Sequence, residues 1–403
     1  MSPISNYFYS VKNYMLEGDI NSILDIDDSI FVSNKGTFIC KGILEAVSPE
    51  EIEEVLASME GQPTNEIKPF VMFGMPFDPN SPTAQRYGQI ILPKEMIHVD
   101  SHNWVTHFHV SSESNLAEDS YPVISAVSHP HHIEMMSPES KDQFIDKVES
   151  ALKNIEAGNV TKVVIARQLN VVADIEIDSR LLIKELIDSQ PESFVFAYEN
   201  FIGASPELLV EKFRDTVRCL PMAGTRKRHA RQDDDDLDIA DLQTNVKDSV
   251  EHQVVVEDIV QKLSNLAINV TSSKTPHVVR LPHVSHLTTS ISATAKENTS
   301  LMDLVKCLHP TPAVAGTPTE TAIKLLAQIE GFDRGLYGAP VGWINSLGDG
   351  QCAIAIRCAR IDGNRAQLFA GVGIVEGSVA QTEWNETQAK FGVIRDAMMN
   401  IAQ

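Results

Sequence analysis

Several segments of the chain repeat apolar residues every three or four positions, which is typical of helices with one buried face. Residues 141–157 carry such a stripe, formed by Phe144, Ile145, Val148, Leu152 and Ile155. The same spacing predicts three further helices, over residues 179–189, 237–268 and 380–401.

Other segments are rich in β-branched and aromatic residues and are bounded by turn residues, as strands are. Residues 161–171 form one predicted strand, and residues 194–213 form a predicted hairpin that turns at Glu199 and Asn200. Before residue 135, short apolar runs alternate with Pro, Gly and Asn, which indicates strands joined by loops.

Residues 335–375 predict three more strands, with turns at 348–350 and 362–364. The strands therefore follow one another as hairpins, and no glycine-rich nucleotide-binding loop leads from a strand into a helix. This order favours an α+β fold with largely antiparallel sheets over a doubly wound fold.

The composition is that of a globular protein with a strongly acidic surface. The chain has 403 residues, 43% of them hydrophobic, which is enough for an extensive core in one large domain or two smaller ones. The formal net charge of −22 repels phosphates and anionic membranes, so we expect neither nucleic acid nor membrane as a partner. An anionic ligand would need a local group of cations, a metal ion or backbone N–H donors.

The cysteines and the N-terminus indicate a cytoplasmic protein. The chain has five cysteines, an odd number without a C-x-x-C pair, and this favours reduced thiols. We find no N-terminal leader pattern and no apolar run of about 18 residues.

Two of the predicted helices place acids on one face. Asp248 and Glu251 lie three residues apart, and Glu383 and Glu386 repeat this spacing, with Lys390 a turn further along. Carboxylate oxygens suit a hard cation such as Mg²⁺. Spacing alone leaves open that these are solvated helix faces, because it does not show whether the two helices meet. The acidic run 233–236 is typical of a helix N-terminus.

Seven segments, read in order, resemble the chorismate-utilising enzyme family, which includes isochorismate, salicylate, anthranilate and aminodeoxychorismate synthases. They are GASPELLV, PMAGTR, KDSVEH, HPTPAVAGTP, AIRCAR, FAGVGIV and EWNETQAK. The resemblance covers residues 137–403, whereas residues 1–135 match loosely, through PFDP at 76–79, the isochorismate synthases of siderophore pathways. It implies a single chorismate-binding domain over 1–403, with two extended, mostly antiparallel sheets packed together and helices on the outside.

By this resemblance, Glu251 and Glu386 correspond to direct Mg²⁺ ligands, and Asp248 and Glu383 to acids that act through water. Asp248 stands where Glu is common, and its shorter side chain fits a water-mediated role. The groups implied to bind the substrate are Gly224, Thr225, His286, Ala313, Tyr337, Arg357, Gly371, Gly373 and Lys390. Among them, an arginine fork suits a carboxylate, and glycines let backbone N–H donors come close. Without the resemblance, a surface ion pair for Arg357 and a core role for His286 stay open.

The resemblance also implies the acid and the base of the reaction. Lys162 corresponds to the general base of the isochorismate and salicylate branches, and Glu207 to the general acid. A lysine acts as a base only when neutral, and a glutamate as an acid only when protonated, and burial favours both forms. Taken alone, each residue could equally be a solvated side chain at the end of a strand.

Two positions separate the branches of the family. Ala223 stands where aminodeoxychorismate synthases carry a nucleophilic lysine, and Ala313 stands where salicylate and amino-transferring members commonly carry threonine. We therefore expect a monomeric, Mg²⁺-dependent isochorismate synthase that acts on chorismate for siderophore synthesis, without an amidotransferase partner. Salicylate synthase and a menaquinone-pathway isochorismate synthase are the alternatives, followed by the ammonia-using branch and by a non-catalytic chorismate- or metal-binding protein.

Overall fold

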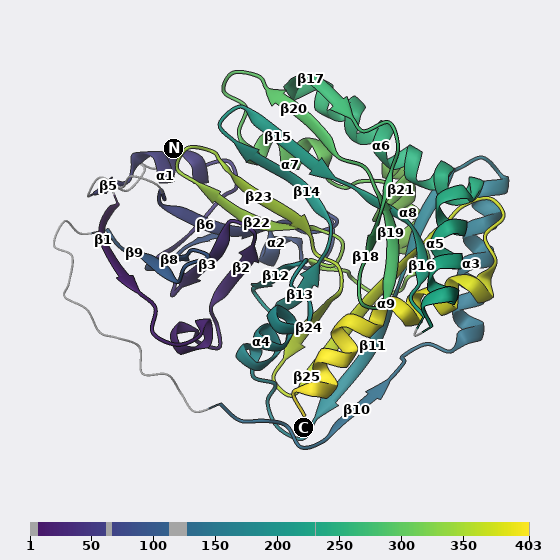
Figure 1. Ribbon diagram of the computed structural model, residues 1–403, viewed down its shortest axis with the longest axis horizontal. Helices are drawn as coiled ribbons and strands as arrows, with labels where there is room; N and C mark the ends of the chain where they lie inside the picture. The colour runs from purple at the N-terminus through teal and green to yellow at the C-terminus, as the bar shows by residue number, and fades with distance from the viewer. Residues whose placement is uncertain (1–6, 62–66, 113–126, 230, 403) are drawn as a thin grey trace.

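The computed structural model describes residues 7–61, 67–112, 127–229 and 231–402. Within them, two large sheets dominate, and all of their strand pairs are antiparallel except β1 with β5. Figure 1 shows the N-terminal strands at one end of the molecule and the long C-terminal helix α9 near the other end. The predicted α+β class with mostly antiparallel sheets is confirmed.

The larger sheet has 13 strands and contains both N-terminal and C-terminal segments. In spatial order it runs β10 (Ile133–Met136), β11 (Lys162–Ala173), β25 (Arg365–Ile374), β24 (Cys358–Asp362), β13 (Phe201–Ser205), β12 (Phe194–Tyr198), β2 (Ser29–Ser33), β3 (Gly36–Lys41), β8 (Glu95–Val99), β9 (Trp104–Ser111), β1 (Phe8–Met15) and β5 (Glu60–Gly61), with β21 (Gly316–Thr317) beside β11.

The second sheet has seven strands, in the order β17 (Ala267–Ser272), β20 (Ile291–Ala295), β15 (Thr216–Leu220), β14 (Leu208–Phe213), β23 (Gly350–Ile354), β22 (Pro340–Asn345) and β6 (Phe70–Gly74). Smaller sheets are formed by β16 (Met222–Lys227), β19 (Val284–Thr288) and β18 (His277–Arg280), and by β4 (Glu45–Val47) and β7 (Ile90–Leu92).

One hydrophobic core lies between the two large sheets, and a second lies under helices on the outer face of the larger sheet. In the first, Phe38 of β3 stacks on Trp343 of β22 at 3.9 Å between ring centroids. The second core joins apolar residues of β2, β12 and β13 to α4 and α9. Strands from before residue 112 contribute to both large sheets, so this part of the chain completes the core.

The helices are α1 (Ile52–Ser58), α2 (Ala84–Tyr87), α3 (Lys141–Glu156), α4 (Ser179–Ser189), α5 (Gln232–Thr244), α6 (Val246–Leu266), α7 (Leu301–Leu308), α8 (Thr319–Ile329) and α9 (Ala380–Asn400), with a 3₁₀ turn η1 (Ile20–Ile23). Helix α3 starts where predicted because Ser140 and Gln143 form a capping box. Among the described residues, no helix has the length and apolar character needed to cross a membrane.

The prediction of one helix over 237–268 was wrong. The structure has two helices, α5 and α6, which meet at Asn245. The Asn245 side chain accepts hydrogen bonds from the backbone N–H groups of Lys247 and Asp248, so it caps α6 while its extended backbone ends α5. Residues 267–268 belong to β17.

The prediction of three strands over 335–375 was also wrong, because the middle one is divided in two. Strand β23 belongs to the seven-stranded sheet, and β24 belongs to the 13-stranded sheet. Between them, Arg357 has φ +52°, a left-handed conformation that redirects the chain from one sheet to the other. The apolar pattern runs on across this point and gave no sign of the change.

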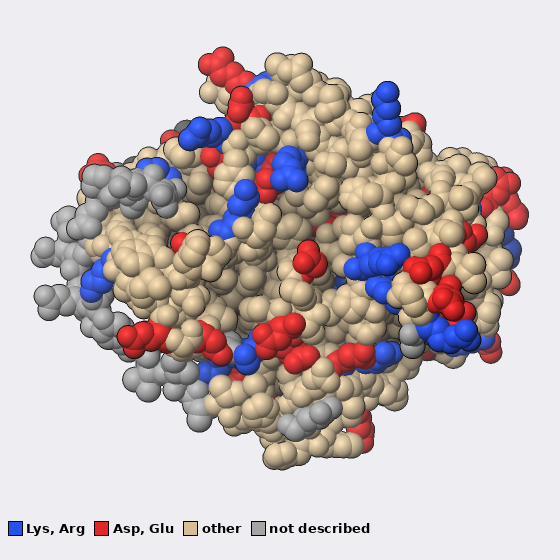
Figure 2. All heavy atoms as spheres, viewed as in Figure 1, with Lys and Arg blue, Asp and Glu red and all other residues tan. Residues whose placement is uncertain are grey.

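Charged residues on the visible face are interspersed. Figure 2 shows Lys and Arg side chains scattered among Asp and Glu and many uncharged residues. The net charge of −22 therefore does not appear there as one uniformly acidic surface.

Candidate active site

Lys162 opens β11 and is buried, with 2% of its surface exposed. Its Nζ lies 2.9 Å from Oε1 of Glu251, which projects from α6. A Cβ atom at Gly373 would lie 2.5 Å from Glu251 Oε1 and 3.0 Å from Lys162 Cε. The glycine therefore makes room for this ion pair, and a side chain there would displace it.

Glu207 lies between β13 and β14 and is also buried. Burial raises its pKa from 4.5 to about 7, against the opposing effects of the Met222 backbone N–H and of three cations, Lys162, Arg357 and Lys390. Burial therefore favours a protonated carboxyl, the form that a general acid needs.

Arg357 and His286 form a buried pair. Arg357 Nη2 donates to His286 Nε2 at 2.9 Å, so the other ring nitrogen, Nδ1, carries the proton and donates to the Gly224 carbonyl at 3.2 Å. Burial, together with the charges of Arg357 and Lys390, lowers the pKa of His286 well below its usual value, in agreement with a neutral ring. Arg357 Nε is buried and has no hydrogen-bond partner among the described residues, so this arginine retains a donor for an anion.

Tyr337 and Lys390 belong to different segments of the chain, and both approach Gly371 of β25. The Tyr337 ring stacks on Phe369 at 5.1 Å, and its hydroxyl would lie 2.6 Å from a Cβ at Gly371. Lys390, on α9, donates to the Gly371 carbonyl at 2.9 Å and pairs with Glu386 at 2.6 Å. Gly371 thus lets both side chains approach the strand.

These residues surround one cavity, which we call the inner cavity. Of the residues predicted for the site, it is lined by Glu207, Gly224, Thr225, Glu251, His286, Ala313, Tyr337, Arg357, Gly371, Gly373 and Lys390. Lys162 is not part of the lining, but it is paired with Glu251, which is.

A second hollow, which we call the acidic cavity, adjoins the first and shares Thr225, Glu251 and Gly373 with it. Its lining contains all four of the predicted metal-binding acids, Asp248, Glu251, Glu383 and Glu386. Helices α6 and α9 therefore meet, which spacing alone could not show.

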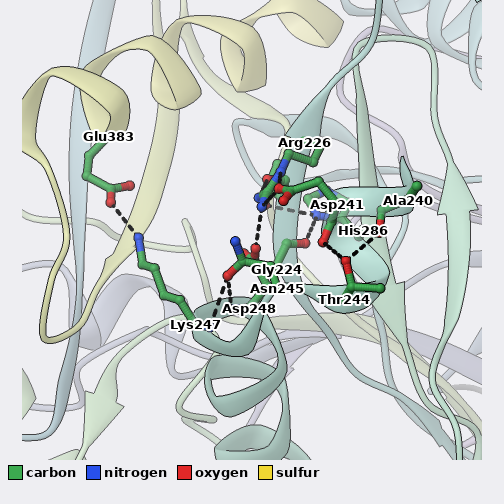
Figure 3. Close-up of polar contacts among 11 residues, drawn as sticks. Gly224, Arg226, Ala240, Asp241, Thr244, Asn245, Lys247, Asp248, His286 and Glu383 are labelled. Carbon is green, nitrogen blue, oxygen red and sulfur yellow. Dashed lines mark hydrogen bonds and ion pairs between the residues drawn. The ribbon is translucent and has the colours of Figure 1, made fainter. Parts of the chain in front are cut away.

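Each of the four acids is paired with its own cation. Arg226 lies 2.6 Å from Asp248, and Lys247 lies 3.0 Å from Glu383 (Figure 3). The other two pairs are Lys162 with Glu251 and Lys390 with Glu386. Oxygen ligands from two helices around one cavity fit a hard divalent cation.

The pKa values of these acids differ with their partners. Burial raises the pKa of Glu251, but the charge and hydrogen bond of Lys162 outweigh it, and the net result is a lowered pKa. For Glu383, burial and the neighbouring Glu386 outweigh Lys247, and the pKa is raised. Burial and the neighbouring Glu386 therefore disfavour the charged form of Glu383.

The sequence analysis missed two cations of the site, Arg226 and Lys247. Both lie inside motifs that it quoted, PMAGTR and KDSVEH, but pairing between distant elements leaves no sequence pattern. Arg226 also pairs with Asp241 of α5 and so ties this helix to the site. The roles predicted for the individual residues stay predictions.

The family follows from comparison with known proteins. Residues 46–399 match the family described as "Chorismate binding enzyme". Isochorismate synthase MenF of Bacillus subtilis (strain 168) is 39% identical over 255 residues, 62% of this chain and 54% of MenF. Isochorismate synthase DhbC of the same organism is 28% identical over 381 residues, 89% of this chain and 90% of DhbC.

A solved structure agrees along almost the whole chain. It is the putative 2,3-dihydroxybenzoate-specific isochorismate synthase DhbC from Bacillus anthracis, with a TM-score of 0.78 and 29% identity, covering 94% of this chain and 98% of that one. The match of the family over 46–399 includes both cavities, and the chain belongs to the chorismate-binding enzymes.

Proposed function

We propose that the protein is an isochorismate synthase. The reaction adds water at ring carbon 2 of chorismate and expels the hydroxyl at carbon 4, while the double bonds shift between them. The observation that carries this proposal is the inner cavity, where Glu207, with its pKa raised to about 7, faces a space adjoining the Lys162–Glu251 pair. The named activities of both DhbC and MenF support it.

In this proposal, Glu207 donates its proton to the departing hydroxyl, because a neutral carboxyl can donate while a carboxylate cannot. Lys162 accepts a proton from the attacking water and must be neutral to do so. In the structure its Nζ contacts Glu251 and is not part of the cavity lining, so base catalysis requires Glu251 to give up this contact.

Arg357, Tyr337 and Lys390 are proposed to hold the carboxylates of the substrate. Arg357 offers its unpartnered Nε–H, and a guanidinium binds a carboxylate through two parallel hydrogen bonds. His286 keeps the guanidinium in place through Nε2. These contacts would orient the ring between the acid and the base.

We also propose that Mg²⁺ is the cofactor, held by Glu251 and Glu386, with Asp248 and Glu383 acting through water. When bound, the ion supplies positive charge for the ring carboxylate. The acidic cavity supports this assignment, because four carboxylates line it and carboxylate oxygens are the ligands that Mg²⁺ prefers.

Product analysis tests the reaction. Purified protein with chorismate and Mg²⁺ should form isochorismate, identified by chromatography, without pyruvate and without added ammonia. The matched control is the same reaction after removal of divalent ions with a chelator, which should be inactive. Salicylate together with pyruvate would move the protein to the salicylate branch, and an ammonia requirement would move it to the amino-transferring branch.

For the pathway, we propose catechol siderophore synthesis through 2,3-dihydroxybenzoate. The support is that the similarity to DhbC extends over 89% of the chain and so includes much of the N-terminal part. The PFDP stretch, which resembles the siderophore-type enzymes, supports the segment that carries Tyr337. The Arg334 guanidinium lies over the Phe77 ring at 4.3 Å, and the Phe77 backbone N–H donates to the Gly335 carbonyl. Deleting the gene should remove 2,3-dihydroxybenzoate from the culture; loss of menaquinone alone would contradict this proposal.

A further inference from the structure

A group of metal-binding side chains lies outside both cavities of the site, on the N-terminal strands of the larger sheet. Glu95 of β8 and His107 and His109 of β9 offer one ligand atom each, and these atoms all lie within 4.8 Å of one another. His107 Nε2 lies 2.8 Å from Glu95 Oε2, and the two imidazole rings lie 4.1 Å apart between centroids.

The local structure explains why the three side chains meet. His107 and His109 are two residues apart on β9, so they point to the same face of the sheet. Glu95 lies directly opposite His109 in the β8–β9 ladder and shares this face. The strand sequence HFH at 107–109 is thus the pattern that marks the pair of ligands.

Two cations lie beside the group: Lys12, opposite His107 in the β1–β9 ladder, and Lys41, which is neutralised by two carboxylates. Lys41, opposite Glu95 in the β3–β8 ladder, lies 2.8 Å from both Asp25 and Asp28. Its charge is therefore balanced by two carboxylates, which leaves the Glu95 carboxylate available to a metal ion.

The group opens into a cavity of about 760 Å³, which has no residue in common with the inner or the acidic cavity. Lys12, Tyr14 and Glu17 of the N-terminal segment also line this cavity. Solvent and small ligands can therefore reach the ligand atoms.

We propose that Glu95, His107 and His109 form a site for a zinc-type divalent cation, with a fourth position open to water or a small anion from the cavity. Two imidazoles and one carboxylate are borderline donors that suit Zn²⁺ or Co²⁺, whereas Mg²⁺ prefers oxygen ligands alone. Tetrahedral Zn²⁺ sites bring their ligand atoms to within about 3–3.5 Å of one another, so small side-chain rotations complete this geometry. The bound ion would join β8 to β9.

Zn²⁺ titration tests the proposal. Isothermal calorimetry on the full chain, in excess Mg²⁺ so that the acidic cavity is occupied, should show one equivalent of Zn²⁺ bound. His109→Ala should weaken this binding by at least about 10- to 100-fold, which is the typical cost of losing even an outer-shell partner. His102→Ala is the matched control, because His102 lies in the same β8–β9 hairpin beside a carboxylate, Asp100, but is exposed. Equal affinity in the wild type and in His109→Ala would overturn the site.

A second measurement does not depend on any variant folding. Co²⁺ bound to the wild type should give the intense visible absorption of four-coordinate cobalt with nitrogen ligands, and Zn²⁺ should displace it. Only the weak spectrum of six-coordinate, oxygen-bound cobalt would overturn the proposal. His109→Asn, which is closer in size to histidine, replaces His109→Ala if the alanine variant does not fold.

Discussion

The inner cavity and the acidic cavity share Glu251 but differ in whether their charged groups have partners. In the acidic cavity, each of the four carboxylates has a cation as its partner. In the inner cavity, Arg357 retains a buried donor that no group in the described part of the chain accepts, and Glu207 is buried with a raised pKa. The difference matches the functions proposed for them, cation binding in the acidic cavity and binding of an anionic substrate in the inner cavity.

The comparison also explains how an acidic protein can bind a dianion. A chain with a net charge of −22 repels chorismate at a distance, yet Arg357 and Lys390 line the inner cavity. Of the four acids that line the acidic cavity, Glu251 alone also lines the inner cavity, and its carboxylate is paired with Lys162. The N-terminal parts of α6 and α9 therefore place most of this acidic charge in the neighbouring cavity.

The largest expected effect comes from Lys162, which contacts the shared residue Glu251. Lys162→Met should lower kcat by about 10²- to 10⁴-fold, the usual contribution of a positioned base, because the methionine cannot accept a proton. Steady-state rates and calorimetric binding of chorismate measure the two properties separately, and binding should persist.

Lys141→Met is the control for this variant, because Lys141 is exposed at the start of α3. It should leave kcat unchanged. Turnover of Lys162→Met within a few-fold of the wild type would remove Lys162 from the mechanism.

The next effect concerns pH and Glu207. Because its pKa is about 7, the protonated acid is lost as the pH rises through 7, and kcat should fall over this range. Glu207→Gln should lower kcat by about 10²-fold and abolish this limb of the pH profile. A rate profile from pH 5 to 9, taken on both proteins, measures it.

The same pKa predicts a change in stability. Folding favours the neutral carboxyl, so its contribution is complete below 4.5 and is lost as the pH rises through about 7, by up to about 3 kcal/mol. Above pH 7, Glu207→Gln should therefore gain stability relative to the wild type in denaturant unfolding. The exposed Glu192→Gln should show no such gain, and a gain that does not depend on pH would contradict the assigned pKa.

Local patterns predicted the elements that carry the site better than they predicted the breaks between them. Residues 141–157, 179–189 and 380–401 form helices with nearly the predicted bounds, because their apolar stripes face a core. The break at Asn245 was missed, because the side-chain cap of one residue interrupts an apolar spacing that otherwise continues. The change of sheet at Arg357 was missed for a similar reason, since one backbone conformation decides it.

For the site, sequence spacing predicted only which acids share a helix face. That Glu251 and Glu386 line one cavity depends on how the tertiary fold brings together the N-terminal parts of α6 and α9, which are more than a hundred residues apart, and the family resemblance supplied this expectation. The ion pairs of Arg226 and Lys247 were not predicted from either source, because they cross from one element to another.

The smallest expected effect concerns Lys247, and its measurement tests whether this lysine competes with the proposed metal ion for the acids of the acidic cavity. The Lys247 side chain, 37% exposed, holds Glu383, and such partly exposed ion pairs contribute about 0–1 kcal/mol. In Lys247→Ala, the negative charges of Glu383 and Glu386 would be neutralised less by nearby cations. Mg²⁺ binding, measured by calorimetry without substrate, should therefore tighten by up to about fivefold. The matched control is Lys262→Ala, which removes an i,i+4 pair with Asp258 from the same helix outside the cavity and should leave the affinity unchanged. Weaker Mg²⁺ binding in Lys247→Ala would mean that this lysine supports the acids rather than competing for them, and the contrast between the two cavities would then fail.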